Sequence, residues 1–313
     1  MAERPALSIV IPCYNSADTI GSLVAELATL QIEGGLEVIL VNDGSQDGTA
    51  SVCRGLVRST AVPVTFVNLS RNFGEHNAVM AGLRVARGAH IVTMDDDGQN
   101  PPSEVVKLHC QARESGHDIV YTYYAEKQHD IWRNLGSWLT NRAADFLLDK
   151  PKGLYLSSFR CMSAFVVEQI CHYEGPYPYV DGLLFQVTQN VGRLQVEHAQ
   201  RRVGRSTYTM TKLLRLWLNM FLNFSVVPLR VSSVLGLLLS SVGFVLTVLV
   251  AIEALLTSTP RGWGSLMCAL FIFCGVQLLT VGLVGEYVGR MYLTANRRPQ
   301  SVVRDVIRRD DRP

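Results

Sequence analysis

The sequence lacks paired cysteine motifs and clustered histidines. None of its 7 cysteines stands in a Cys-x-x-Cys pair, and its 7 histidines show no metal-ligand spacing. These absences argue against a zinc site and against a disulfide framework. The net charge of +2 is nearly balanced, so the composition gives no support for nucleic-acid binding. The N-terminus has no basic segment followed by an apolar run, so we expect no cleaved signal peptide.

Charge is scarce in the C-terminal part of the chain. Overall, 48% of the residues are hydrophobic and the mean hydropathy is +0.17, between the values of soluble enzymes and membrane proteins. Residues 231–256 and 264–285 carry one charge between them, Glu253, and each stretch is near the ~20 residues that span a bilayer. The alternative is a buried helical hairpin in a large soluble domain. Two such stretches in succession favour a pair of transmembrane helices within residues 230–289.

Basic residues flank both apolar stretches. Lys212 and Arg230 precede the first stretch, and a larger group follows the second: Arg290, Arg297, Arg298, Arg304, Arg308 and Arg309. The positive-inside tendency therefore predicts that both termini and a globular domain of residues 1–209 are cytoplasmic. Residues 210–229 place apolar and polar residues at helical spacing, which suits an amphipathic helix in the membrane interface. Residues 290–313 are expected to form a basic cytoplasmic tail.

Residues 1–209 alternate strand-like and helix-like patterns. Short apolar runs lie at residues 7–12, 36–42, 64–68, 89–94 and 118–121, and segments of helical character separate them. Alternation of this kind predicts a mostly parallel sheet with helices on both faces. The carboxyl ends of parallel strands meet at one edge, which is where ligands of open α/β sheets bind.

Polar residues follow three of the predicted strands at this edge. They are Pro12, Tyr14 and Asn15 after the first strand, Asp43 after the second, and Asp95, Asp96 and Asp97 after the fourth. Tyr14 can flank a nucleotide base, and Asp43 can accept from a base or ribose. Adjacent carboxylates repel one another unless a cation relieves them, so the acidic cluster suggests a divalent metal on a diphosphate. Each segment is also compatible with an ordinary turn, and the acidic one with a cap for the helix opening at Pro102.

Four segments at these positions resemble glycosyltransferase family 2: IVIPCYN at 9–15, VNDGS at 41–45, RNFG at 71–74 and DDDGQNPP at 95–102. VPLR at 227–230, the two apolar stretches and GEYVGR at 285–290 narrow the resemblance to bacterial polyprenyl-phosphate glycosyltransferases, relatives of dolichyl-phosphate mannose synthase and undecaprenyl-phosphate aminoarabinose transferases. The resemblance implies a GT-A fold and inverting transfer of a sugar from a nucleotide sugar, with UDP the first expectation, to undecaprenyl phosphate. The product would serve cell-envelope glycan or lipopolysaccharide modification. A multi-pass location in the bacterial inner membrane and homo-oligomers are also compatible with it.

The resemblance assigns roles to single residues. Asp95, Asp97 and Gln99 would hold Mg²⁺ or Mn²⁺, and Asp96 would face the nucleotide. The pattern Arg-x-x-Gly-x-Ser-x-Tyr at residues 201–208 would receive the acceptor phosphate. The candidates there are Arg201, Arg202, Ser206, Tyr208 and Lys212. An arginine suits this role because its planar fork binds phosphate oxygens in pairs, although a solvated or lipid-facing basic patch is the alternative.

The chain departs from the family pattern at three positions. Ser158 stands where relatives carry an Asp often proposed as a base, Thr207 replaces a usual Lys, and Ser16 replaces a usual Glu. A phosphate monoester with its second pKa near ~6 is largely dianionic at cytosolic pH, so the acceptor can be its own nucleophile. Catalysis is then expected to involve Asp97 at the metal, Arg160 and Arg201 at the attacking phosphate, and Ser158 in the choice of donor sugar.

Two other kinds of protein share part of this pattern. A processive polysaccharide synthase would carry a Gln-x-x-Arg-Trp motif and more membrane spans, and the sequence shows neither. A non-catalytic membrane scaffold of an envelope-glycan assembly complex would explain the three departures. The intact acidic cluster argues against such a scaffold.

Overall fold

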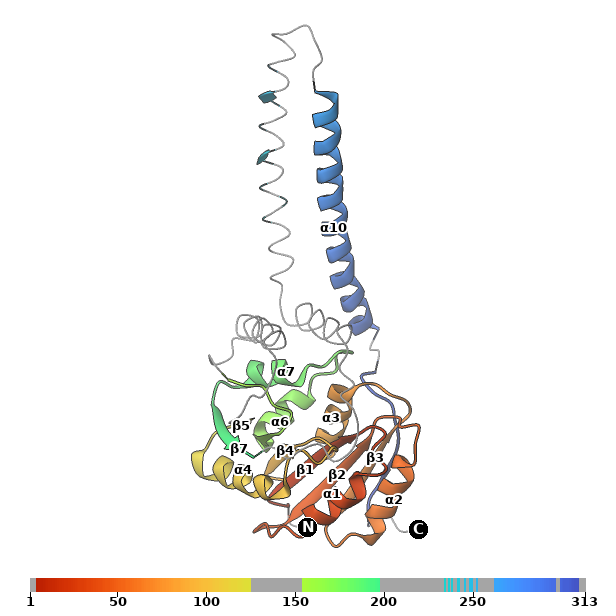
Figure 1. The fold of residues 1–313 in the computed structure, drawn as a ribbon, viewed down its shortest axis with the longest axis vertical. Coiled ribbons are helices and arrows are strands. Elements are labelled where there is room, and N and C mark those ends of the chain that lie inside the picture. The colour runs from red at the N-terminus through yellow and green to blue at the C-terminus, as the bar shows by residue number, and fades with distance from the viewer. Residues whose placement is uncertain are drawn as a thin grey trace. The chain divides into compact units, whose positions relative to one another are not determined.

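The computed structural model describes residues 4–124, 154–197, 262–296 and 299–309, together with isolated positions between 234 and 252. Its contacts divide the chain into two compact units, Met1–Leu213 with Pro299–Pro313, and Leu214–Arg298. The strands of the first unit are β1 (Leu7–Cys13), β2 (Leu36–Asn42), β3 (Val64–Leu69), β4 (His90–Thr93), β5 (Ile119–Tyr124), β6 (Arg160–Ser163), β7 (Val191–Val196) and β8 (Val303–Ile307). Its helices are α1 (Ile20–Leu27), α2 (Thr49–Ser59), α3 (Glu75–Leu83), α4 (Pro102–Ser115), α6 (Ala164–Cys171) and α7 (Val180–Val187) (Figure 1).

The strands form one sheet in the order β7-β5-β6-β4-β1-β2-β3-β8. β1 pairs in parallel with β2 and β4, β2 with β3, and β5 with β7. β6 runs antiparallel to β4 and β5, and β8 runs antiparallel to β3. The predicted α/β fold with a mostly parallel sheet is thereby confirmed. The sequence patterns predicted β1 to β5 but not β6, β7 or β8.

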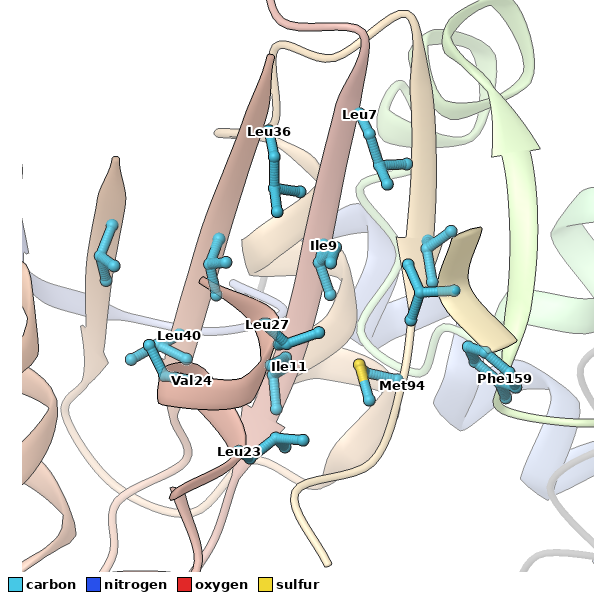
Figure 2. Packing of buried hydrophobic residues seen from close by; sticks show 14 of the residues in the cluster. Leu7, Ile9, Ile11, Leu23, Val24, Leu27, Leu36, Leu40, Met94 and Phe159 are labelled. Carbon is cyan, nitrogen blue, oxygen red and sulfur yellow. The ribbon is translucent and has the colours of Figure 1, made fainter. Parts of the chain in front are cut away.

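Helices pack on both faces of the central strands. α1 buries residues at helical spacing against the sheet face that carries Ile9 and Ile11, as Figure 2 shows for Leu23, Val24 and Leu27. Neighbouring residues of a strand point to opposite faces, so Val10 belongs to the other face. There a Cβ added to Gly82 of α3 would lie 2.4 Å from Val10 Cγ1. The glycine therefore permits close packing of α3 on the sheet, and this packing fixes the position of α3.

The end of the chain contributes more structure than a basic tail. Val303–Ile307 form β8 beside β3, where Arg54 donates to Asp305 Oδ2 at 2.9 Å.

In the second unit, α10 (Trp263–Ala295) includes the second predicted span, residues 264–285. Within the described part of the chain, no helix combines the length and apolarity that a membrane crossing requires. The predicted interfacial helix, residues 210–229, and most of the first predicted span, residues 231–256, lie outside the described residues.

Candidate active site

The polar segments predicted to share one sheet edge contact one another. The backbone N–H of Tyr14, after β1, donates to Asp96 Oδ2, after β4, at 3.1 Å. The backbone N–H of Asn15 donates to Ser45 Oγ at 3.0 Å, and Asn15 Oδ1 accepts from the backbone N–H of Gln46 at 2.9 Å. Asn15 has a φ of +53°, a left-handed conformation that Asn tolerates better than most residues. These bonds join the segments that follow β1, β2 and β4.

Asp43 anchors the segment that precedes α3. Its side chain is buried and accepts from the backbone N–H groups of Phe73 at 2.7 Å and Gly74 at 2.9 Å. Burial raises the pKa of Asp43, and these two hydrogen bonds oppose the rise. The neighbouring Gly44 has a φ of +64°, and a Cβ there would lie 2.3 Å from the carbonyl carbon of Arg71. Asp43 thus has a structural role here, and its predicted contact with a nucleotide stays a prediction.

The three aspartates after β4 have different partners. Ser158 Oγ donates to Asp95 Oδ2 at 2.7 Å, and the backbone N–H of Gln99 donates to Asp97 Oδ1 at 3.1 Å. Burial raises the pKa of Asp95; the Ser158 hydroxyl opposes this rise, while repulsion from Asp97 and Asp96 adds to it. Burial is also the main cause that raises the pKa of Asp96. Crowded carboxylates with raised pKa values are stabilised by a nearby cation.

The predicted metal ligands fit a divalent ion by their chemistry. Carboxylate oxygens of Asp95 and Asp97 and an amide oxygen of Gln99 are donors that Mg²⁺ and Mn²⁺ accept. No group of three or more His, Cys, Asp or Glu side chains is arranged to hold a metal among the residues that the structure describes. The predicted set has only two such side chains, so its remaining ligands would come from an amide, solvent and the diphosphate of a donor.

Arg160 is held in a buried ion pair. It opposes Thr93 in the pairing of β6 with β4, and its Nη1 donates to Asp181 Oδ1 from α7. The hydroxyl of Tyr121 donates to the same carboxylate at 2.7 Å, and the guanidinium lies 5.7 Å from the Tyr121 ring centroid. Within the described structure, Arg160 Nε is buried and has no hydrogen-bond partner. Asp181 therefore neutralises the guanidinium that was predicted to hold a phosphate. The Nε–H group of Arg160 is left without an acceptor among the described residues.

A small pocket opens where these elements meet. It is lined by the ends of β1 and β4, by the segment entering β6, and by the first turn of α3: Pro12, Thr93, Met94, Asp95, Ser158, Arg160, Glu75, His76 and Val79. Thr93 Oγ1 donates to the backbone carbonyl of Ser158 at 2.6 Å, which fixes Ser158 beside Asp95. The pocket brings together the predicted residues Pro12, Asp95, Ser158 and Arg160.

The sequence patterns missed two titratable residues of this pocket, Glu75 and His76. The Glu75 side chain keeps contact with solvent, yet desolvation of its carboxylate and the proximity of Asp95 raise the pKa of Glu75 to about 7. Burial lowers the pKa of His76 to about 4, so its ring is neutral at cytosolic pH. Their position directly after the RNFG segment was the signal available in the sequence. Asp181 was missed as well, because no motif marks it.

The residues predicted to receive the acceptor phosphate follow β7 in the sequence. Arg201, Arg202, Ser206, Tyr208 and Lys212 all lie outside the described residues. Their relation to the pocket therefore stays a prediction.

The sequence model of the family described as Glycosyl transferase family 2 matches residues 8–170, which include every described residue of the pocket. The chain therefore belongs to glycosyltransferase family 2 and is a glycosyltransferase, as its motifs predicted.

Curated relatives are similar along almost the whole chain. The undecaprenyl-phosphate 4-deoxy-4-formamido-L-arabinose transferase of Aeromonas hydrophila subsp. hydrophila is 31% identical over 311 residues, covering 96% of this chain and 94% of the relative. The protein of the same name from Yersinia enterocolitica is 32% identical, covering 96% of this chain and 93% of the relative. Among solved structures, glucosyl-3-phosphoglycerate synthase from Mycobacterium tuberculosis, in complex with Mn²⁺, UDP-glucose and phosphoglyceric acid, has a TM-score of 0.53. It is 17% identical and covers 70% of this chain and 78% of that chain, which shows a shared fold.

Proposed function

We propose that the chain transfers a sugar from a nucleotide sugar, with UDP the first expectation, to undecaprenyl phosphate in the presence of Mg²⁺ or Mn²⁺. The supporting observation is that Asp95, which follows β4, lines a pocket and is close in sequence to Asp97, in a chain similar over 96% of its length to undecaprenyl-phosphate sugar transferases. The product would be an undecaprenyl-monophosphate sugar.

Asp95, Asp97 and Gln99 would hold the metal ion. When bound, the ion would supply positive charge that neutralises the leaving diphosphate. The residues around the metal site contribute by holding the backbone of the site in place. Asp96 fixes the backbone of Tyr14 and Asp43 fixes the segment before α3, so both shape the site that receives the nucleotide. Preorganised groups of this kind lower the barrier because they need no rearrangement during the reaction.

The transfer step requires no protein base. An oxygen of the dianionic acceptor phosphate forms the new bond to the anomeric carbon, while the bond from that carbon to the diphosphate oxygen breaks and its electron pair leaves with the nucleotide diphosphate. The acceptor becomes a phosphodiester with one negative charge, so no proton has to move. Ser158 in place of an aspartate is compatible with this chemistry, because Ser158 already donates to Asp95 and no proton acceptor is needed there.

Arg160 has a different role from the predicted one in this proposal. Its buried pairing with Asp181 means that a phosphate would have to displace a carboxylate to bind it. We therefore assign Arg160 to positioning the segment 158–160 beside Asp95. Residues 201–212 supply the cationic groups for the acceptor phosphate, with Arg201 the main candidate.

The proposed acceptor is a lipid, so the protein is expected to act at a membrane. The apolar stretches at residues 231–256 and 264–285 and their basic flanks support a multi-pass inner-membrane protein with its catalytic unit and both termini in the cytoplasm. Proteolysis of inverted membrane vesicles, in which the cytoplasmic side faces outward, would cleave the α/β unit under this topology. Full protection of that unit would contradict it.

The test is transfer by the full chain in detergent. Undecaprenyl phosphate, Mg²⁺ or Mn²⁺, and a panel of UDP-, GDP- and dTDP-sugars that includes UDP-4-deoxy-4-formamido-L-arabinose are incubated with the enzyme, and lipid products are detected by mass. One donor should give an undecaprenyl-monophosphate sugar. Asp97→Asn should lower the rate by about 100-fold or more, whereas Glu168→Gln, on the exposed face of α6, should not change it. Absence of a lipid product with every donor would contradict the proposal, and full activity of Asp97→Asn would contradict the metal site.

A further inference from the structure

The backbone of Glu75 is held in place beside the pocket, and its side chain is exposed. Glu75 is the first residue of α3, and the backbone N–H of the preceding Gly74 is held by Asp43 Oδ2 at 2.9 Å. Gly74 has a φ of +95°, which turns the chain into the helix, and Gly82 packs the same helix closely on the sheet. The carboxylate of Glu75 is thereby presented to the pocket that also contains Asp95 and Ser158.

The pocket has more acidic groups than basic ones. Asp95 and Glu75 line it, and Asp96 and Asp181 lie close enough to act on Glu75 electrostatically. In the described part of the chain, the pocket lining has one permanent cation, Arg160, and Asp181 already neutralises it. The positive charge of a metal ion at the acidic cluster would be offset by the negative charge of the diphosphate that the ion binds. A negatively charged substituent on a sugar would therefore be repelled here by these carboxyl groups in their ionised form.

The pocket also offers hydrogen bonds of both kinds to an uncharged ligand. Arg160 Nε is a buried N–H donor that has no partner among the described residues. The Ser158 hydroxyl donates its hydrogen bond to Asp95, so Ser158 Oγ can only accept a hydrogen bond from a ligand. The Glu75 carboxylate is likewise an acceptor. A sugar hydroxyl, which donates and accepts, or an amide N–H would complement this arrangement. An unpaired buried donor such as Arg160 Nε is costly unless a ligand oxygen completes it.

We propose that Glu75 determines donor-sugar specificity: it accepts a hydrogen bond from an O–H or N–H group of the transferred sugar and excludes sugars that carry a carboxylate. This inference rests on the proposed transfer reaction, since it assumes that the pocket receives the donor sugar. The alternative role of Glu75 is to stabilise the N-terminus of α3 through the helix dipole. Such a role would change stability but would not discriminate between sugars.

The experiment compares two donors of nearly the same shape that differ in charge. UDP-glucose and UDP-glucuronate differ only in a hydroxymethyl group against a carboxylate. Each competes with a fluorescent UDP analogue for the full chain in detergent with Mn²⁺, and unlabelled UDP serves as the reference. The wild-type protein should bind UDP-glucuronate at least about tenfold more weakly than UDP-glucose. Glu75→Gln should reduce this ratio several-fold and leave UDP affinity unchanged, whereas Glu168→Gln should leave the ratio unchanged.

Two results separate this inference from the proposed function. An unchanged ratio in Glu75→Gln overturns the specificity role, even if the enzyme transfers sugar to undecaprenyl phosphate. A reduced ratio supports the specificity role, even if no lipid-linked product is found and the proposed acceptor is wrong. Glu75→Ala provides a second variant, because it removes the carboxylate without introducing the amide that Glu75→Gln introduces. Its ratio should fall in the same direction.

Discussion

Replacing Asp181 with alanine should strongly destabilise the α/β unit, because it leaves the Arg160 guanidinium buried without its counter-charge. Arg160 is 3% exposed and Asp181 is 7% exposed, so solvent can replace little of the lost interaction. Removing one partner of a buried ion pair costs about 3–5 kcal/mol. For a unit of about 200 residues, each kcal/mol lowers the Tm by about 2–4 °C. The expected decrease is therefore about 6–20 °C.

The assay is thermal unfolding of the full chain in detergent, followed by circular dichroism. Tyr121→Phe removes only the hydroxyl that donates to Asp181 and should cost about 1 kcal/mol, since the ion pair stays intact. The double variant Asp181→Ala with Arg160→Met removes both charges and should recover much of the stability lost in Asp181→Ala. A decrease below about 2 °C for Asp181→Ala, or a double variant whose losses simply add, would refute the buried pairing.

Two further predictions concern the frame around the site. Gly44→Ala should destabilise the unit by about 2 kcal/mol or more, because its Cβ would meet the backbone of Arg71. Gly35→Ala is the control: Gly35 also has a positive φ but lies in open space, so this variant should lose less stability. Equal losses of the two variants in urea unfolding would contradict this prediction. Burial lowers the pKa of His109 from 6.5 to about 4, so the folded chain binds fewer protons in that window and loses stability as pH falls through it. His109→Gln should flatten this slope, and an unchanged slope would contradict the assignment.

The central strands and the strand-end motifs could be predicted from the sequence because they depend on local patterns. Continuous apolar runs identified β1 to β5, and the polar segments after β1, β2 and β4 followed from the parallel arrangement. β6 to β8 could not be predicted in this way. β6 is only four residues long, and β8 is a charged edge strand that joins the sheet more than 200 residues after β3. Pairings across such a separation leave no periodic signal nearby.

The roles of individual site residues were harder to predict than their presence near the edge. Asp43 has the residue type of a nucleotide ligand, but its contacts are with the backbone of Phe73 and Gly74. Arg160 has the residue type of a phosphate ligand, but it is paired with Asp181 from α7. Both partners are contributed by other elements of the fold. A motif can thus identify a residue at a site without revealing which of its atoms are already engaged.

The acidic character of the pocket follows from residues that only the fold brings together. Ser158 stands where the family resemblance predicts an aspartate, and this difference alone suggests a pocket with less negative charge. The structure brings Glu75, from the start of α3, to the same pocket. Ser158 donates to Asp95 and therefore cannot repel it, while Glu75 approaches from a different element. Glu75 therefore supplies the pocket with a carboxyl group from the side of α3. Because a dianionic acceptor phosphate, with its second ionisation near pH ~6, needs no base, we expect Ser158 and Glu75 to act on the choice of sugar rather than on the transfer step.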